Sequence, residues 1–261
     1  MAQVEPIYLC TTMIIMLEDN QEKGSATGFF YVNTNNKLFL ITNKHVVYGE
    51  KYYENPPTEI NRFRLNLHIN PNNLSHNEFV EVSLFDDKCN RLWLEHENPN
   101  VDVIILPVDI DRKRYIIAPL DKSLFDSQDL IINFEKIFVM GYPYGWYDRL
   151  NNLPISRIGH LSSPFDVDFN GQALMLGDVE THPGMSGGPV FIWLKDYTTK
   201  NGNNRTTHLG RTKIILAGVH SGQPRWDLID STTKTIKEIR HSLINVWNYR
   251  LINEIFSLNK I

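Results

Sequence analysis

Residues 182–191, HPGMSGGPVF, form the most informative stretch of this 261-residue chain. Three glycines surround Ser186 and allow a tight turn without Cβ clashes, and Pro189 then leads into PVFIW, an apolar run typical of a strand. A serine in such a turn presents its hydroxyl beside backbone N–H groups, here those of Gly184 and Ser186, which suit the stabilisation of an oxyanion. The stretch therefore predicts a nucleophilic serine, although a Gly-rich β-turn with an incidental serine would have the same sequence.

Two residues far from this turn have the chemistry to activate Ser186. A serine hydroxyl needs a base, usually a histidine whose tautomer is fixed by a buried carboxylate. His45 follows the apolar run LFLITNK, just past an expected strand end, and Asp102 begins the apolar run VDVIILPV, where a charge needs a partner. Alone, each could be structural, His45 as a hydrogen-bonding residue and Asp102 as a turn cap. Together the three residues predict a Ser-His-Asp catalytic set.

Short apolar runs rich in Val, Ile, Phe and Tyr recur along the chain, bounded by turn residues. NTNNK at 33–37 is expected to be a hairpin turn, and NGNNRTTHLG at 201–210 a longer surface connection. The pattern predicts an all-β fold, as a sandwich or as barrels.

Residues 238–256, EIRHSLINVWNYRLINEIF, depart from this pattern. Apolar residues recur there at mostly three- and four-residue spacing, at Ile239, Leu243, Val246, Trp247, Ile252 and Ile255. The spacing predicts an amphipathic helix packed on the β body.

The composition is that of an ordinary globular protein, with 42% hydrophobic residues. The 26 basic and 30 acidic residues give a formal net charge of −4 and form no basic stripe. We therefore expect no nucleic-acid partner.

Only Cys10 and Cys89 are present, so a disulfide framework does not hold the fold together. We expect two buried free thiols, with a single disulfide between them as the alternative. The apolar stretch near the N-terminus follows Glu5 and Pro6 without a preceding basic region, unlike a secretory signal. No run approaches the ~18 apolar residues needed to span a bilayer. These features favour a cytoplasmic protein without a membrane partner, and a secreted mature form whose leader has been removed stays open.

Three blocks, TNKHVV, VDVIIL and PGMSGGPV, in this order resemble the His, Asp and Ser blocks of trypsin-like peptidases of the chymotrypsin fold. The resemblance is nearest to the disulfide-poor bacterial type, such as HtrA-like and glutamyl endopeptidases. SATGFFYV at 25–32 resembles the G-x-G-F strand of that group, with Ala26 and Thr27 as departures.

The resemblance implies two antiparallel six-stranded β-barrels with the catalytic cleft between them, and a serine endopeptidase that acts on protein or peptide substrates through an acyl-enzyme. His45 and Asp102 would lie in an N-terminal barrel, residues 1–115, and Ser186 in a C-terminal barrel, residues 116–237. The polar stretch 109–130 would connect the barrels, and residues 238–261 would form the C-terminal helix.

Met185 is a departure from the digestive and blood-clotting branch, which has an Asp there that pairs with a newly cut N-terminus. We therefore expect activity without propeptide cleavage, controlled, if at all, by loop order or by an activating protein partner. The chain ends soon after the expected helix, which leaves no room for the PDZ domain of HtrA proteins.

The run IILAGVHSGQ at 214–223 resembles the strand that lines the primary specificity pocket. Gly218 and His220, together with Thr181 five positions before Ser186, match glutamyl endopeptidases and picornavirus-type proteases, which cut after Glu or Gln. Ser221 also falls in this substrate-binding strand.

An imidazole and a hydroxyl at the pocket floor can donate hydrogen bonds to a carboxylate or carboxamide oxygen, which favours cleavage after Glu or Gln. Glu180, six positions before Ser186, would favour a basic residue if its side chain pointed into the pocket. Small apolar residues are the third alternative.

His182 is interpreted as a loop residue at the pocket mouth rather than as a second functional histidine. The remaining histidines lack zinc-ligand spacing, so we expect no metal and no cofactor; they are His68, His76, His96, His160, His208 and His241. Two rival functions stay open: a pseudoprotease that binds peptides without cutting them, and a latent protease activated inside a larger assembly.

Overall fold

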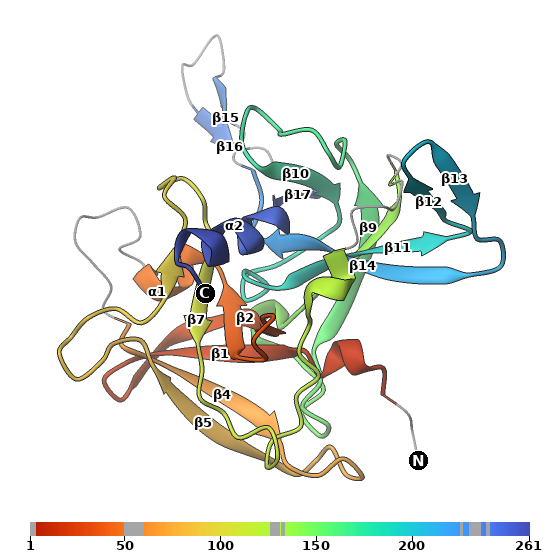
Figure 1. Ribbon diagram of the computed structural model, residues 1–261. Coiled ribbons are helices and arrows are strands. Elements are labelled where there is room, and N and C mark those ends of the chain that lie inside the picture. Colours follow the sequence, from red (N-terminus) through yellow and green to blue (C-terminus); the bar gives the residue numbers. More distant parts are fainter. Residues whose placement is uncertain are drawn as a thin grey trace.

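Two β-structures follow one another along the chain (Figure 1). The computed structural model describes residues 4–49, 60–125, 131, 134–224, 227–229, 236–238 and 241–261. An antiparallel seven-stranded sheet has the strand order β5-β4-β1-β2-β3-β7-β6, and a closed antiparallel barrel has the order β10-β17-β14-β11-β8-β9. The all-β prediction is confirmed.

The first sheet contains β1 (Thr11–Glu18), β2 (Gln21–Val32), β3 (Leu38–Thr42), β4 (Arg62–His68), β5 (Asn77–Ser83), β6 (Leu94–Glu95) and β7 (Ile104–Pro107). The barrel contains β8 (Lys136–Gly141), β9 (Ile155–Leu161), β10 (Leu174–Asp178), β11 (Pro189–Lys195), β14 (Thr212–His220) and β17 (Leu243–Asn248). The described residues also contain the α-helices α1 (Lys44–Tyr48) and α2 (Arg250–Leu258). Short 3₁₀ helices are η1 (Pro6–Tyr8), η3 (Lys122–Phe125) and η4 (Pro143–Gly145).

The first sheet has seven strands rather than the expected six, because the segment before β7 forms the separate two-residue strand β6. Its two edges come together just beyond β5 and β6, where Leu92 N–H donates to the carbonyl of Leu84 and Phe85 bridges Arg91. The sheet therefore curls toward a barrel. The double-barrel architecture implied by the resemblance is confirmed.

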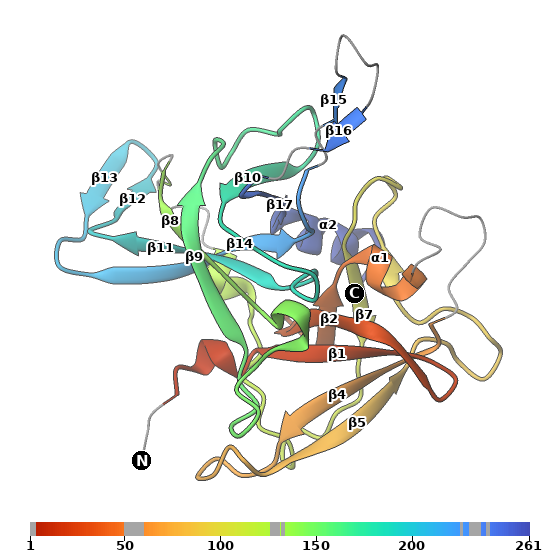
Figure 2. The same cartoon turned by 180° about the vertical axis from the view of Figure 1, so that it is seen from behind.

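Buried side chains fill each sheet and the space between the two. The interior of the first is filled by side chains such as Phe63 and Leu65, and that of the second by side chains such as Ile192 and Val246. A third cluster joins the two, and α2 contributes Phe256 to it, whose ring lies 4.9 Å from that of Phe39. Figures 1 and 2 show α2 between the two β-structures from opposite sides. A continuous apolar core thus joins the two barrels.

The prediction of one helix over residues 238–256 is wrong in its first half. Leu243–Asn248 is strand β17, which pairs with β10 and β14 and closes the barrel, and the helix begins only at Arg250. Alternating β-branched residues, Ile244 and Val246, are fully buried in the barrel, as expected for a strand that pairs on both sides. Residues 239–240 of the predicted helix lie outside the described part of the chain.

The expected turn at residues 33–37 is confirmed, since Val32 of β2 pairs with Leu38 of β3 across it. The expected surface connection at 201–210 is more ordered: β12 (Thr198–Asn201) and β13 (Asn204–Thr207) form a hairpin. A second hairpin joins β15 (Asp227–Ile229) and β16 (Ile236–Glu238). The connection expected at 109–130 runs between β7 and β8, and its residues 126–130 lie outside the described part.

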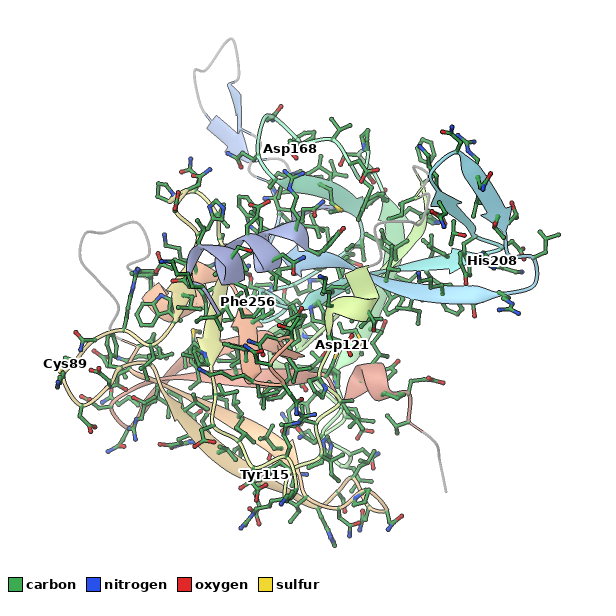
Figure 3. All side chains as sticks on the ribbon, in the orientation of Figure 1. Cys89, Tyr115, Asp121, Asp168, His208 and Phe256 are labelled. Atoms are coloured by element: carbon green, nitrogen blue, oxygen red, sulfur yellow. The ribbon has the colours of Figure 1, made fainter. Side chains whose placement is uncertain are left out.

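Both cysteines are free thiols, but only Cys10 is buried. Cys89 lies in an exposed turn with a φ of 61°, at the periphery of the molecule in Figure 3, so the expectation of two buried thiols is wrong for this residue. Among the described residues, no helix is long and apolar enough to cross a membrane.

Candidate active site

His45 and Asp102 form a two-point contact at the edge of the first sheet. His45 is the second residue of α1, and its backbone N–H donates to Asp102 Oδ1 at 2.9 Å. Its ring Nδ1 lies 2.8 Å from Asp102 Oδ2. Because the carboxylate accepts the proton on Nδ1, the lone pair of a neutral imidazole lies on Nε2, where a general base needs it.

Asp102 is 7% exposed and lies just before β7, as its apolar neighbours predict. The side-chain amide of Asn43 donates to its backbone carbonyl at 2.7 Å, and Ser221 Oγ donates to Oδ2 at 2.7 Å. His45 and Ser221 thus both contact the carboxylate of Asp102, which lies beside the imidazole ring.

Ser186 and His45 line one cavity of about 530 Å³. Its other lining residues are Met16, Lys23, Ser25, Ala26, Val46, Tyr48, Gly49, Ile60, Pro183 and Gly184. The first sheet and α1 form one wall, and the turn that carries Ser186 forms the other. A substrate held in this cavity would reach both residues.

The two peptide groups that precede Gly184 and Ser186 are each fixed by a hydrogen bond to their carbonyl oxygen. Pro183 O accepts a 2.6 Å hydrogen bond from Tyr144 N–H, and Met185 O accepts a 3.0 Å bond from Gly188 N–H. In a trans peptide the N–H points away from the C=O, so each contact also aims the following N–H, that of Gly184 or Ser186. Neither N–H has an acceptor among the described residues, and both residues line the cavity. The turn thus offers two free donors beside the serine.

Two glycines of the turn are required by close packing at positive φ. Gly184 has a φ of +93°, and a Cβ there would lie 2.4 Å from the carbonyl oxygen of Tyr142. Gly187 has a φ of +84°, and a Cβ there would lie 2.1 Å from Thr42 Oγ1. A larger residue at Gly187 would displace the turn from the first sheet, and a larger residue at Gly184 would displace it from the segment around η4.

Thr27, a departure from the resemblance, supports the serine turn from the first sheet. Its N–H donates to Ser186 O at 2.9 Å, and its Oγ1 donates to Gly184 O at 2.7 Å and accepts from Tyr142 N–H at 3.2 Å. Thr42 Oγ1 in turn donates to Thr27 O at 2.8 Å. Sequence reasoning missed this role, and no local pattern around Thr27 indicates it, because the contacts to Gly184 span 157 residues.

Thr181 and His220, expected at the specificity pocket, are buried polar residues. Burial lowers the pKa of His220 to about 4, against an opposing hydrogen bond to the backbone of Asn245, so its ring is neutral at pH 7. His220 Nδ1 is buried and has no hydrogen-bond partner in the part of the chain that the structure describes. A buried, unpaired polar atom is suited to a ligand that completes its hydrogen bonding.

Gly218 and Ser221, also expected to bind substrate, have structural contacts of their own. A Cβ at Gly218 would lie 1.8 Å from the carbonyl oxygen of Trp247, so this glycine allows β17 to approach β14. Ser221 Oγ contacts Asp102 instead of an open pocket.

Glu180 does not occupy a buried pocket. Its side chain is 67% exposed and pairs with Arg157, with 2.7 Å between Arg157 Nη2 and Glu180 Oε2. His182 stacks on Tyr144, with 5.1 Å between ring centroids, in agreement with its interpretation as a loop residue. Within the described part of the chain, no three His, Cys, Asp or Glu residues gather as they would around a metal ion.

A family model described as a trypsin-like peptidase domain matches residues 26–192, which contain all three residues of the candidate catalytic set. No curated protein sequence matches the chain.

Solved structures of several proteases share its fold. The Rv3671c protease of M. tuberculosis, in an inactive form, is 16% identical with a TM-score of 0.50, over 97% of this chain and 89% of that chain. The protease Anisep of Arthrobacter nicotinovorans is 13% identical with a TM-score of 0.53, over 97% of this chain and 96% of that chain. A thermostable serine protease from an extremophilic microorganism is 11% identical with a TM-score of 0.51, over 98% of both chains.

Proposed function

The chain belongs to the trypsin-like peptidase family, and from this premise we propose that it cleaves peptide bonds with Ser186 as nucleophile, His45 as general base and Asp102 as the residue that orients the base. The family is one of serine endopeptidases, whose substrates are proteins and peptides. The observation that carries the assignment is the 2.8 Å contact between His45 Nδ1 and Asp102 Oδ2, with His45 on the same cavity as Ser186.

In the proposed reaction, Ser186 Oγ attacks the scissile carbonyl while His45 Nε2 takes the hydroxyl proton. The carbonyl π electrons move to the oxygen, and the N–H groups of Gly184 and Ser186 stabilise the resulting oxyanion. The tetrahedral intermediate collapses, the C–N bond breaks, and the His45 imidazolium gives its proton to the leaving amine. Water, activated by His45 in the same way, then hydrolyses the acyl-enzyme and restores Ser186.

The N–H groups of Gly184 and Ser186 are both available to an oxyanion, which supports a turn that is ready for catalysis. Both donors matter, since losing one costs about 2.7–4 kcal/mol of transition-state stabilisation in comparable enzymes. Tyr144 N–H and Gly188 N–H donate to the carbonyl oxygens of the same two peptide groups and so fix the orientation of both N–H groups. This favours an active enzyme over the latent alternative.

For the residue before the cut bond we propose Gln or Glu, bound by Thr181 and His220. A neutral imidazole supplies a hydrogen bond but no charge, and burying a carboxylate without a counter-charge is costly. We therefore expect Gln to be preferred over Glu at pH 7. The pairing of Glu180 with Arg157 at the surface weakens the case for a basic residue.

A fluorophosphonate probe tests the catalytic assignment. Wild-type protein, Ser186→Ala and His45→Ala are labelled side by side, and the modified peptide is identified by mass spectrometry. Labelling at Ser186 that disappears in both variants supports the proposal. An unlabelled wild-type protein indicates a pseudoprotease or a latent enzyme, and the two are separated by repeating the labelling with candidate partners.

A peptide library with all residues before the cut bond tests the specificity. We expect enrichment of Gln and, less strongly, Glu, and loss of that enrichment in Thr181→Val. A wild-type profile without either residue would overturn this part of the proposal and leave the catalytic assignment intact.

A further inference from the structure

Glu95 is a partly buried carboxylate outside the candidate catalytic set, and four donor groups lie near it. Its side chain is 10% exposed. Oε1 accepts from the Tyr48 hydroxyl and the Trp93 indole N–H, each at 2.7 Å, and forms an ion pair with Arg91 Nη1 at 3.2 Å. Oε2 lies 3.1 Å from Lys44 Nζ. Nothing in the proposed reaction uses this group directly.

Two of these four donors, Lys44 and Tyr48, are the first and last residues of α1, the helix that contains His45. The helix has five residues, and its N-cap residue Asn43 makes no side-chain capping bond. A helix this short is not stable by itself in water. The position of His45 therefore depends on what holds α1 from outside.

Two carboxylates hold α1 at neighbouring points of the first sheet. Asp102 accepts the backbone N–H of His45, and Glu95 accepts the side chains at the two ends of the helix. Glu95 pairs with Ile104 across β6 and β7, only two residues after Asp102. Both carboxylates thus belong to one rigid part of the sheet.

A further contact strengthens this link. Lys44 Nζ lies 3.4 Å from the carbonyl oxygen of Pro99, in the segment that leads to Asp102. The ring of Tyr48 also packs edge-on against Trp93, with 6.0 Å between centroids. Tyr48 lines the catalytic cavity together with His45, so a displacement of α1 would move the cavity wall that faces Ser186.

We propose that Glu95 is a positioning residue that fixes α1, and with it His45, relative to Asp102 and Ser186. This inference rests on the proposed function. The charge of Glu95 persists at neutral pH. Burial alone would raise the pKa of this carboxyl, but hydrogen bonds from Trp93, Tyr48 and Lys44 outweigh that effect and lower the pKa.

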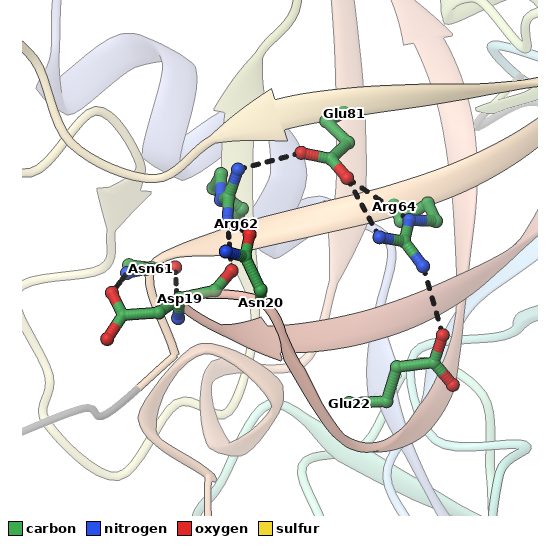
Figure 4. A network of polar contacts seen from close by, with 7 residues as sticks. All are labelled: Asp19, Asn20, Glu22, Asn61, Arg62, Arg64 and Glu81. Carbon is green, nitrogen blue, oxygen red and sulfur yellow. Dashed lines mark hydrogen bonds and ion pairs between the residues drawn. The ribbon is translucent and has the colours of Figure 1, made fainter.

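The chain provides a matched control in the polar network of Figure 4. Glu81 pairs with Arg62 at 2.9 Å and with Arg64 at 3.0 Å, and Arg64 also pairs with Glu22. Arg62 also donates to the backbone carbonyl of Asp19. This network joins β4, β5 and the β1–β2 turn and contains no residue of α1 or of residues 91–102.

The experiment compares steady-state cleavage of a peptide substrate by the wild-type protein, Glu95→Gln, Glu95→Ala and Glu81→Gln, at a temperature where thermal unfolding shows each to be folded. Gln keeps an oxygen that accepts from Tyr48 and Trp93 but loses the charge that pairs with Lys44. A misplacement of about 1 Å costs about 100-fold in rate, so we expect kcat to fall about tenfold in Glu95→Gln and further in Glu95→Ala. KM should stay within about twofold of wild type in both.

Fluorophosphonate labelling of Ser186 should slow by the same factor in the Glu95 variants, because it also needs His45 in place. Glu81→Gln should match wild type in both assays. If Glu95→Ala does not fold, Glu95→Gln and Tyr48→Phe carry the test. Unchanged kcat and labelling in folded Glu95→Gln and Tyr48→Phe would overturn the inference, whereas absence of labelling in the wild-type protein would overturn the proposed function instead.

Discussion

Ser221 Oγ donates a 2.7 Å hydrogen bond to Asp102 Oδ2, the same carboxylate oxygen that lies 2.8 Å from His45 Nδ1. Ser221 directly follows β14 of the C-terminal barrel, and Asp102 lies just before β7 of the first sheet. The candidate catalytic set is therefore held from both β-structures. The second barrel contacts the pair of His45 and Asp102 and also carries Ser186.

This contact predicts that Ser221→Ala lowers kcat/KM by about tenfold, because a hydrogen bond to a charged group contributes about 1.5 kcal/mol or more. The remaining carboxylate contacts with His45 are unchanged, so the variant should still be labelled at Ser186. Cleavage kinetics on a peptide substrate measure the effect. Ser75→Ala, at a turn hydroxyl that donates to Asn73 Oδ1, is the control. Equal kcat/KM for Ser221→Ala and wild type would contradict the prediction.

Thr27→Val should reduce both stability and the rate of Ser186 labelling. Valine has nearly the same shape, but it leaves Gly184 O and Tyr142 N–H without their hydrogen bonds, and one unpaired buried group costs about 1–3 kcal/mol. Urea unfolding and labelling kinetics measure the two effects separately.

Thr42→Val is the matched control, because its hydroxyl donates to Thr27 O and not to the serine turn. It should lower the free energy of unfolding while labelling stays near wild type. Equal slowing of labelling by the two variants would show that Thr27 acts only through general stability.

Gly184→Ala should lower kcat by about 100-fold or more, because an added Cβ collides with Tyr142 O and displaces the N–H aimed at the oxyanion. Gly171→Ala is the control, with a φ of +73° and no atom within 4 Å of the added Cβ. It should cost about 1 kcal/mol of stability through backbone strain alone. A Gly184→Ala enzyme with wild-type kcat would remove Gly184 from the proposed oxyanion hole.

The residues of the candidate site that could be predicted are those marked by a pattern in the residues next to them in the sequence. A strand followed by a polar residue gives His45, a charge at the start of an apolar run gives Asp102, and glycines around a serine give Ser186. The contacts that hold these residues could not be predicted, because they join segments 119 residues apart for Ser221 and Asp102 and 157 apart for Thr27 and Gly184.

The error at the C-terminus has a different origin. In residues 243–248, apolar side chains satisfy both a helical period and the alternation of a strand, and only pairing with β10 and β14 decides between them. Glu95 was missed because its partners Lys44 and Tyr48 lie about fifty residues away in sequence, although Trp93 and Arg91 are close to it. Contacts between segments distant in sequence therefore determine that residues 243–248 form a strand and that Glu95 contacts α1.

His220 predicts a loss of stability in mild acid. Its folded-state pKa is about 4 because burial disfavours the charged ring, whereas in the unfolded chain the ring takes up a proton near pH 6.5. Between these values the unfolded state binds more protons, so the free energy of unfolding falls as the pH drops from about 6.5 to about 4. Each pH unit of this gap contributes about 1.4 kcal/mol, which gives a loss of about 2 kcal/mol at pH 5.

Urea unfolding at pH 7, 6 and 5 measures this loss in the wild-type protein and in His220→Gln, which has no group to titrate at that position. Burial also lowers the pKa of His68, which adds a loss of the same sign that both proteins share. The difference between the two slopes therefore isolates His220, and exposed His76→Gln serves as the control for removing a histidine. We expect the variant to be less stable than wild type at pH 7 but to lose less stability on acidification. Parallel pH dependences of wild type and His220→Gln would mean that the pKa of His220 is the same in the folded and unfolded chains, and burial would then no longer explain a neutral ring in the pocket.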